Sequence, residues 1–503
     1  MRRSLGAAAL AFALAAGSAG AAAIKGTNRV DLLRGTARAD RIDARGGSDR
    51  IKVDGGGRDT VRCGPGRYDV VNADKFDSVA ADCETVARIV ARDPYPAPAQ
   101  HATIAEPDTF SWGNVVVTAF QAGRFRDGGG AVNIGWATSH DGGRTWRSGL
   151  LPALTVASRP AGRWRRASDP VVAYDAAHGV WLVASLAFSP GDAGAVVVSR
   201  SADGLTWSAP VTVAEAPSRQ DLLLDKEWIV CDSGATSPYR GSCYVSYSDF
   251  RTVRLEFQAS RDGGLTWEPP VASPDDAGRA SMRGRWAPAP QPVVQPDGDL
   301  IVPYFDETRV ASVRSADGGR SFSASVTVAP TTFKPTPDLR APPLPSAEVD
   351  QAGTVYVVWP DCRARPSCGF DDLVLSRSAG GITWSPATRI PIAPRSSRSD
   401  FVIPGLGADR DRVGRLAVAY YVFRSAALLD VGFISSSNGG RTWNAPRRLN
   451  AQTMRLDWIA QAGGAMVGDY ISTSFARGRA VTAFPVAARS TRFDQPLFAA
   501  VIP

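Results

Sequence analysis

The chain has 503 residues, of which 44% are hydrophobic and 21% charged, a composition typical of a globular protein with more than one folded unit. Its formal net charge of +8 comes almost entirely from arginine, since only five of the 57 basic residues are lysine. Such an excess indicates either a GC-rich genome or affinity for acidic polymers. The chain has no basic run with interleaved aromatic residues and no phosphate or dinucleotide fingerprint, which argues against nucleic-acid and nucleotide binding.

The first 23 residues have the pattern of a secretory signal peptide. A short basic start is followed by an apolar stretch and an A-x-A-like end, with cleavage expected near residues 21–23. No later stretch reaches the roughly 18 apolar residues of a membrane span. We therefore expect a secreted, extracellular protein whose signal peptide is cleaved.

The six cysteines form three pairs that are close in sequence: Cys63 with Cys83, Cys231 with Cys243, and Cys362 with Cys368. In an oxidising compartment such pairs usually form disulfides. Zinc binding is the alternative, but the chain has only three histidines and no C-x-x-C motif.

Residues 26–86 form a glycine-rich unit in which an aspartate recurs every eight to ten residues, with an apolar residue two positions later. This pattern resembles the nonapeptide repeat of the RTX, or haemolysin-type, calcium-binding β-rolls. The resemblance implies a short parallel β-roll with calcium ligands at Asp49, Asp59 and Asp69. Arginine and lysine occupy several turn positions, and because cations oppose bound calcium, a roll with weak or no calcium binding is an equal alternative. The Pro- and Ala-rich residues 87–102 are expected to be a linker.

A short motif then occurs six times between residues 139 and 443, first as SHDGGRTW at 139–146 and last as SSNGGRTW at 436–443. Consecutive copies lie about 55 to 63 residues apart, a period typical of repeat architectures. The acid and the glycines suit a tight hairpin turn, and the final aromatic residue can pack beside it. Two copies replace the aspartate, with Gly380 and Asn438, which favours a structural over a catalytic role.

Each repeat reads as four short alternating strands with no helical stretch, as expected for β-propeller blades. The motif itself resembles the Asp-box, or BNR repeat, of the sialidase superfamily. The resemblance covers residues 103–503 and implies an all-β protein with a seven-bladed Asp-box β-propeller, or alternatively a six-bladed one, preceded by the short β-roll-like segment.

The ligand face of such a protein is predicted to lie opposite the Asp-boxes, because the loops between second and third strands gather there. Arginines that follow these strands are the predicted substrate-binding residues: Arg126, Arg251, Arg285, Arg363 and Arg424. Several stand in an aromatic-x-Asp-x-Arg pattern. The alternative is therefore that an Asp–Arg pair fixes each loop to the neighbouring blade.

The sialidase resemblance implies a tyrosine nucleophile activated by a glutamate, with a separate aspartate as acid and base. By position, Tyr470 is the candidate nucleophile, Glu227 its partner, and Asp169 or Asp225 the acid. The family's F/Y-R-I-P motif is absent, however, and the choice of Tyr470 depends on position alone, so a core tyrosine of the inner strand is the favoured alternative.

The sequence thus predicts a secreted propeller that binds or cleaves extracellular glycans, with exo-α-sialidase-like hydrolysis as the sharpest form of the hypothesis. A non-catalytic propeller that binds glycan, cell wall or protein is the main alternative, and another carbohydrate-active enzyme is the third. The expected partner is an extracellular glycan or cell-surface polymer. No cofactor is expected apart from Ca²⁺ in the N-terminal repeats, and the protein is expected to be a monomer.

Overall fold

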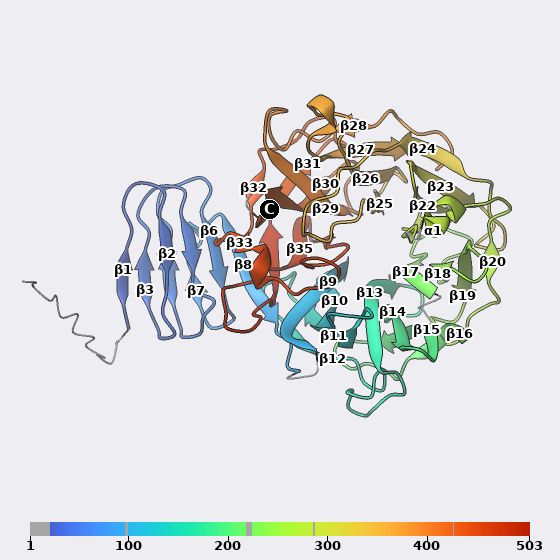
Figure 1. Ribbon diagram of the computed structural model, residues 1–503, viewed down its shortest axis with the longest axis horizontal. Coiled ribbons are helices and arrows are strands. Elements are labelled where there is room, and N and C mark those ends of the chain that lie inside the picture. The colour runs from blue at the N-terminus through green and yellow to red at the C-terminus, as the bar shows by residue number, and fades with distance from the viewer. Residues whose placement is uncertain (1–20, 96–98, 218–223, 285–286, 426) are drawn as a thin grey trace, which may run out of the picture.

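The computed structural model describes residues 21–95, 99–217, 224–284, 287–425 and 427–503 (Figure 1). Nearly all of the predicted signal peptide and the predicted substrate-binding residue Arg285 lie outside the described residues. Strands dominate: the described part of the chain contains one short α-helix, α1 (Arg279–Arg283), and two 3-10 turns, η1 (Pro366–Cys368) and η2 (Leu456–Trp458). No helix in those ranges has the length and apolar character that a membrane crossing needs.

The N-terminal strands stack as the parallel coils of a β-solenoid, drawn in blue in Figure 1. One sheet contains β1 (Ala23–Lys25), β3 (Arg41–Asp43), β5 (Thr60–Arg62) and β7 (Ser78–Val79). The other contains β2 (Leu32–Arg34), β4 (Arg50–Lys52), β6 (Val70–Ala73) and β8 (Thr85–Ala91). Between the sheets, the apolar residues that follow the recurring aspartates form the core, with Ile42, Ile51, Val61 and Val71 at most 1% exposed.

The recurring aspartates hold the coils in register. Asp49 Oδ1 accepts the backbone N–H of Asp31 at 2.8 Å, and Asp69 Oδ1 accepts that of Asp49 at 2.6 Å. On the other edge, Asp59 Oδ1 accepts the N–H of Asp40 at 2.6 Å. Each carboxylate therefore satisfies a donor one coil earlier in the chain, which explains the spacing seen in the sequence.

The remaining strands form sheets that follow one another around a ring (Figure 1). The first sheet contains β9 (Gln100–Trp112), β10 (Val115–Arg124), β11 (Ala131–Ser139), β12 (Arg147–Leu150), β13 (Arg166–Asp175), β14 (Val180–Ser189), β15 (Ala193–Ser201) and β16 (Val211–Pro217). The second contains β17 (Leu224–Cys231), β18 (Cys243–Asp249), β19 (Arg254–Ser260) and β20 (Val271–Ala272). The third contains β21 (Val293–Val294), β22 (Leu300–Asp306), β23 (Arg309–Ser315) and β24 (Val326–Pro330).

Two further sheets and a junction complete the path. One sheet contains β25 (Ser346–Val349), β26 (Val355–Asp361), β27 (Asp372–Ser378) and β28 (Thr388–Arg389), and the next contains β29 (Ser399–Ala408), β30 (Leu416–Arg424), β31 (Leu428–Ser436), β32 (Arg447–Arg448) and β33 (Met454–Arg455). The C-terminal strands β34 (Ser472–Ala476), β35 (Arg479–Pro485) and β36 (Leu497–Ile502) then pair antiparallel with one another, and β36 also pairs antiparallel with β8 of the solenoid. The solenoid and the C-terminus therefore share one seven-stranded sheet.

The all-β class is confirmed, but the predicted architecture is wrong. A seven-bladed or six-bladed propeller preceded by an independent roll requires separate four-stranded blades. The structure instead has a β-solenoid of stacked coils and several sheets of four to eight strands. Pairing of Ala131 with Ala167 joins β11 to β13, and β8 joins β6 to β36. The period of the sequence predicts how many strands each repeat contains, but not which strands of neighbouring repeats are hydrogen-bonded. The predicted division into separate blades was wrong for this reason.

The Asp-box motifs form tight turns between the third and fourth strands of their repeats. In the third copy, Asp262 Oδ1 accepts the N–H groups of Leu265 and Thr266, each at 3.0 Å, and Ser260 Oγ accepts that of Gly264 at 2.9 Å. Burial acts to raise the pKa of Asp262, but these hydrogen bonds outweigh it and lower the pKa to about 2. The motif therefore closes a turn with an ionised carboxylate.

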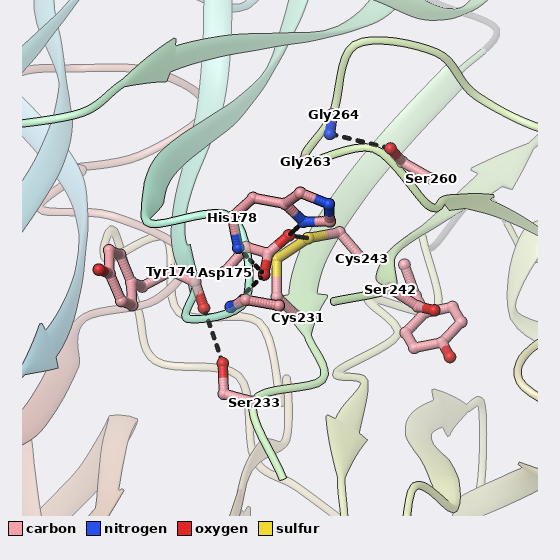
Figure 2. The surroundings of a disulfide bond; sticks show 12 residues. Tyr174, Asp175, His178, Cys231, Ser233, Ser242, Cys243, Ser260, Gly263 and Gly264 are labelled. Atoms are coloured by element: carbon pink, nitrogen blue, oxygen red, sulfur yellow. Dashed lines mark hydrogen bonds and ion pairs between the residues drawn. A yellow bond between two sulfur atoms is a disulfide. The ribbon is translucent and has the colours of Figure 1, made fainter. Parts of the chain in front are cut away.

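The three predicted disulfides are confirmed: Cys63–Cys83, Cys231–Cys243 and Cys362–Cys368. Cys231 and Cys243 face each other on β17 and β18, next to the turn after β13 (Figure 2). In that turn the Asp175 carboxylate contacts His178 Nδ1 at 2.6 Å and accepts the N–H of Ala177. The bridge therefore lies where two successive repeats pack together.

Replacing the turn carboxylate in Asp262→Ala is expected to lower the free energy of unfolding by about 1–2 kcal/mol, because two backbone N–H groups lose their acceptor. Chemical denaturation at pH 7 measures the change. Asp127→Ala, which removes an exposed aspartate, is the control and should stay within about 0.5 kcal/mol of wild type. Equal stability of the two variants would contradict the structural role of the motif.

Candidate functional site

A pocket of about 340 Å³ opens on the face of the ring opposite the Asp-box turns. Its walls come from the β10–β11 loop at residues 128–130 and from residues 188–194 around the β14–β15 turn. Both loops join second to third strands, whereas the Asp-boxes lie at the other ends of β11 and β15. Charged residues line the floor: Arg124, Asp169, Asp225, Lys226 and Arg340.

Bulges in the innermost strands place the residues at the floor of the pocket. Glu106 on β9, Asp169 on β13 and Lys226 on β17 have φ values of 50°, 49° and 52°, in the left-handed region that few non-glycine residues adopt. At each of these positions the register with the neighbouring strand is interrupted. A bulge redirects a side chain, and here three equivalent positions in successive repeats direct their side chains to one point.

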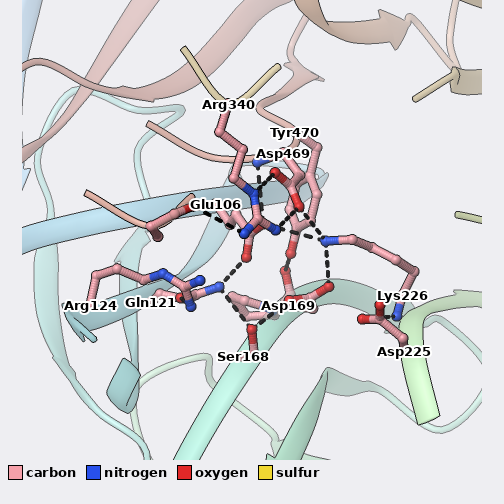
Figure 3. Close-up of polar contacts among 12 residues, drawn as sticks. Glu106, Gln121, Arg124, Ser168, Asp169, Asp225, Lys226, Arg340, Asp469 and Tyr470 are labelled. Atoms are coloured by element: carbon pink, nitrogen blue, oxygen red, sulfur yellow. Dashed lines mark hydrogen bonds and ion pairs between the residues drawn. The ribbon is translucent and has the colours of Figure 1, made fainter. Parts of the chain in front are cut away.

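The ammonium group of Lys226 is the centre of the resulting cluster (Figure 3). Its Nζ lies 2.7 Å from Asp169 Oδ2, 2.8 Å from Asp469 Oδ2 and 3.5 Å from Glu106 Oε1. Burial acts to lower the pKa of Lys226, but the surrounding carboxylates outweigh it and raise the pKa well above the usual value. Lys226, on β17, is therefore a fixed cation shared by acidic side chains of two other strands, β9 and β13, and of the segment before β34.

Lys226 and Arg340 keep two carboxyl groups of this cluster, those of Asp169 and Asp469, ionised. Arg340 Nε donates to Asp469 Oδ1 at 2.7 Å, and its second nitrogen contacts the other oxygen. Although burial acts to raise the pKa of Asp469, Arg340 and Lys226 lower it well below the usual value. Asp169 behaves in the same way, because the attraction of Lys226 outweighs its burial and lowers its pKa.

The other two carboxyl groups are shifted in the opposite direction. Burial, with repulsion from Asp169, raises the pKa of Glu106 to about 8, so this buried group is neutral at pH 7. Burial also raises the pKa of Asp225 to about 6, despite the attraction of Lys226. Asp225 and Asp169 both line the pocket. A pair of carboxyl groups with pKa values pushed apart is the arrangement that general acid and base catalysis uses.

The four predicted catalytic residues separate into two groups. Asp169 and Asp225 reach the pocket, whereas Tyr470 and Glu227 are not among its lining residues and are 6% and 1% exposed. The Tyr470 hydroxyl donates to the carbonyl of Pro170 at 3.0 Å, and burial raises the pKa of the tyrosine well above its usual value. Neither carboxyl oxygen of Glu227 has a hydrogen-bond partner among the described residues, so no hydrogen bond joins this residue to Tyr470. A tyrosine nucleophile activated by Glu227 remains a prediction.

The predicted substrate-binding arginines are not gathered at the pocket. Arg251 pairs with Asp249 and Arg363 with Asp361, each at 2.6 Å, and Arg424 pairs with Asp430. Arg126 is exposed in the β10–β11 loop but does not line the pocket. Their role in substrate binding remains a prediction. Arg251 and Arg363 pair with the aspartate of their own aromatic-x-Asp-x-Arg pattern, and Arg363 also donates to the carbonyl of Pro330 in the preceding sheet, as the alternative expects.

Arg124 and Arg340 supply the arginine side chains at the pocket. Arg340 lies in the proline-rich connection between β24 and β25, where no motif marks it. Arg124, at the end of β10, donates to Gln121 Oε1 at 3.0 Å. Its Nε is buried without a partner, and within the described ranges Arg124 forms no salt bridge. It is therefore a desolvated cation at the pocket wall that is not neutralised by a direct contact.

The predicted calcium residues lie along the two edges of the solenoid. Asp49, Asp59 and Asp69 are at most 1% exposed, and the Oδ2 atom of each is buried without a hydrogen-bond partner. One free oxygen per aspartate matches the ligand chemistry of Ca²⁺, which needs six to eight oxygens. Among the described residues, however, no group of three carboxylates comes together, and the only acidic cluster within ligand distance includes the bridged Cys63 and Cys83. Backbone carbonyls would have to supply the other ligands.

Protonation is the second way to satisfy the Asp69 carboxyl group. Burial raises its pKa to about 6, against a usual value of 3.8. The folded state therefore binds the proton more tightly than the unfolded state, so the stabilisation is complete below pH 3.8 and is lost as the pH rises through 6.

We expect a higher Tm at pH 5 than at pH 7.5, and a smaller difference in Asp69→Asn. If Ca²⁺ also binds there, excess Ca²⁺ should raise the Tm of wild type at pH 7.5 but not that of Asp69→Asn. An unchanged pH dependence in the variant would contradict the assignment.

Lys226→Met should destabilise the ring, because Asp169 and Asp469 would remain buried and lose a cation. Removing one partner of a buried ion cluster costs about 3–5 kcal/mol. Equilibrium denaturation at pH 7 measures this, with Lys75→Met, at an exposed lysine of the solenoid, as the matched control. A loss no larger than that of the control would show that the cluster does not hold the inner strands together.

The family model for the BNR repeat-like domain matches residues 113–390. A leech intramolecular trans-sialidase is 13% identical with a TM-score of 0.44, the match covering 71% of this chain and 69% of that chain. A PL25 ulvan lyase is 12% identical with a TM-score of 0.45, covering 82% and 95%. An α-L-arabinanase from Penicillium chrysogenum is 13% identical with a TM-score of 0.41, covering 82% and 96%. Among curated proteins, none matches this chain. The predicted Asp-box repeat is confirmed by the family model, whereas the RTX resemblance remains a prediction. Because the match spans more than half of its residues, the chain belongs to the BNR repeat-like domain family.

Proposed function

We propose that this protein is an extracellular glycan-acting enzyme that binds an acidic sugar and hydrolyses its glycosidic bond. The sugar would bind in the pocket lined by Arg124, Asp169 and Asp225, which we call the central pocket. The observation that carries the proposal is the pair of pocket carboxyl groups with opposite pKa shifts, Asp169 and Asp225, beside the unpaired Arg124. The three disulfides support an oxidising, extracellular location.

Recognition of the sugar rests on Arg124. A guanidinium group offers paired donors that match the two oxygens of a carboxylate. Arg124 lines the pocket, is only 2% exposed and forms no salt bridge within the described ranges, so a carboxylate on a ligand would supply the anion that this desolvated cation lacks. Arg340 borders the same pocket but is engaged by Asp469. The preferred ligand is therefore a sugar that carries a carboxylate.

Bond cleavage would use the two carboxyl groups in different protonation states. Asp225, protonated below about pH 6, would donate its proton to the glycosidic oxygen as the bond to the anomeric carbon breaks. Asp169, kept ionised by Lys226, would accept a proton from the water whose oxygen adds to that carbon. The products are two sugars with free hydroxyl groups, and one proton returns from Asp169 to Asp225 between turnovers. Activity should therefore fall as the pH rises above 6.

Exo-α-sialidase-like hydrolysis is the most specific form of this proposal, because a sialoside carries its carboxylate next to the anomeric carbon. In this form Arg124 holds the carboxylate. The proposal does not require Tyr470, whose hydroxyl is hydrogen-bonded to the carbonyl of Pro170.

A non-catalytic glycan-binding protein is the second candidate. It is favoured by the contact between Lys226 and Asp169 Oδ2, which occupies the oxygen that a base would use. In this case Arg124 still recognises the acidic sugar, but no bond is broken.

Turnover of fluorogenic α-sialosides and glucuronides by the purified protein distinguishes the candidates. We expect Asp225→Asn and Asp169→Asn each to lower kcat by about 100-fold or more, because each removes a proton-transfer group, while sugar binding is retained. Tyr470→Phe should keep most activity, and Arg124→Gln should raise KM. Arg363→Gln, outside the pocket, is the matched control.

The outcomes separate the two candidates as follows. Binding of acidic sugars without turnover between pH 4 and 8, together with loss of binding in Arg124→Gln, would establish the binding protein. Turnover that Tyr470→Phe abolishes and Asp225→Asn leaves intact would replace this mechanism with the tyrosine nucleophile. Absence of both binding and turnover would overturn the proposed function.

A further inference from the structure

We propose that the chain has a second binding surface, which holds an acidic polysaccharide in a groove between the solenoid and the ring. This junction groove has a volume of about 1500 Å³. It is lined by the solenoid turn at residues 74–77, residues 88–92 of β8 and its end, the first Asp-box at 144–148, and the connection at 486–489. The inference goes beyond the proposed function, which concerns the central pocket alone.

The size of the groove indicates an extended ligand. Small-molecule sites usually have volumes of roughly 300–1000 Å³, and the central pocket, at about 340 Å³, is at the lower end of that range. The junction groove is larger and is bordered by segments that are far apart in sequence. Such a surface suits several units of a polymer better than a single sugar.

The charges that line the groove leave a positive excess. Lys75, Arg144, Arg147 and Arg489 are exposed and form no salt bridge within the described part of the chain. Two of the four acidic residues are already paired, Asp54 with Lys52 and Asp494 with Arg92. Burial raises the pKa of a third, Asp77, to about 6. Anionic groups on a ligand would therefore meet unpaired cations.

Aromatic side chains lie among these cations. Phe76 is 55% exposed, and Trp136 and Trp146 are half-buried on the groove wall. The Trp146 N–H already donates to the carbonyl of Gly143 at 2.9 Å, so this indole offers its apolar ring to a ligand rather than a hydrogen bond. The C–H faces of sugar rings can pack on such surfaces.

The acidic residues of the groove favour a polysaccharide over a nucleic acid. A nucleic acid carries a phosphate on every nucleotide, and its backbone would meet Asp74, which forms no salt bridge among the described residues, as well as the cations. A polysaccharide of uronic acids presents hydroxyl groups between its carboxylates, and these hydroxyls can donate to aspartate side chains. The cations and aspartates that line the groove therefore match the alternating carboxylates and hydroxyl groups of such a polysaccharide.

Fluorescence anisotropy with labelled polygalacturonate tests this inference on the full chain. We expect the triple variant Arg144→Gln/Arg147→Gln/Arg489→Gln to weaken binding by about 10-fold or more, since three charge-assisted contacts are lost. The matched control Arg320→Gln/Arg398→Gln/Arg441→Gln removes the same charge at exposed sites outside the groove and should change binding by less than about twofold. Phe76→Ala should weaken binding, and Leu265→Ala, at an equally exposed apolar residue elsewhere, should not.

Three results would overturn the inference: no polygalacturonate binding, an equal loss in both triple variants, or equally tight binding of duplex DNA or phosphatidylserine vesicles. The groove triple variant should still bind a free sialic acid like wild type, because Arg124 of the central pocket is intact, so loss of groove binding is distinguishable from failure of the central pocket. Thermal unfolding of every variant confirms that the fold is retained.

Discussion

One buried ammonium group, that of Lys226, is shared by three acidic side chains from separate parts of the chain, and the centre of the ring depends on this constraint. Asp169, Asp469 and Glu106 come from different repeats, yet all lie within 3.5 Å of this nitrogen. A buried charge is tolerated only when it is paired. The inner strands must therefore converge, and the left-handed bulges at Glu106, Asp169 and Lys226 are the local backbone feature that lets them do so.

The same constraint connects structure to chemistry. Lys226 lowers the pKa of Asp169, whereas burial outweighs the same cation at Glu106 and Asp225 and raises their pKa values to about 8 and about 6. The cluster thus produces carboxyl groups of different protonation state within one small site. Arg124, at the edge of the cluster, remains without a carboxylate contact, which gives the pocket its preference for an anion.

Strand β8 holds the solenoid and the ring together, as Lys226 holds the inner strands together. It pairs in parallel with β6 of the solenoid and antiparallel with β36 of the ring, so the two parts share one sheet. The position of the solenoid against the first Asp-box follows from that pairing. The pairing of β8 therefore brings together the segments that line the junction groove.

Local chemistry could be predicted from the sequence, but long-range placement could not. The Asp-box turns, the disulfide pairs and the apolar core positions of the solenoid were predictable, because each depends on residues that are close in sequence or strictly periodic. Among the site residues, Asp169 and Asp225 were identified because they begin inner strands. Arg340 was missed because it lies in a connection without a motif, and the charge partners of Lys226 depend on contacts across hundreds of residues. The Glu-Pro and Asp-Pro dipeptides at 106–107 and 169–170 are the one local signal that marks the converging bulges.

The central claim is that the pocket recognises a sugar carboxylate through Arg124. Isothermal titration of wild type and Arg124→Gln with a free sialic or uronic acid and with its methyl ester tests this claim most directly. The account predicts that wild type binds the acid more tightly than the ester and that Arg124→Gln loses this preference. Equal binding of acid and ester by wild type would contradict it.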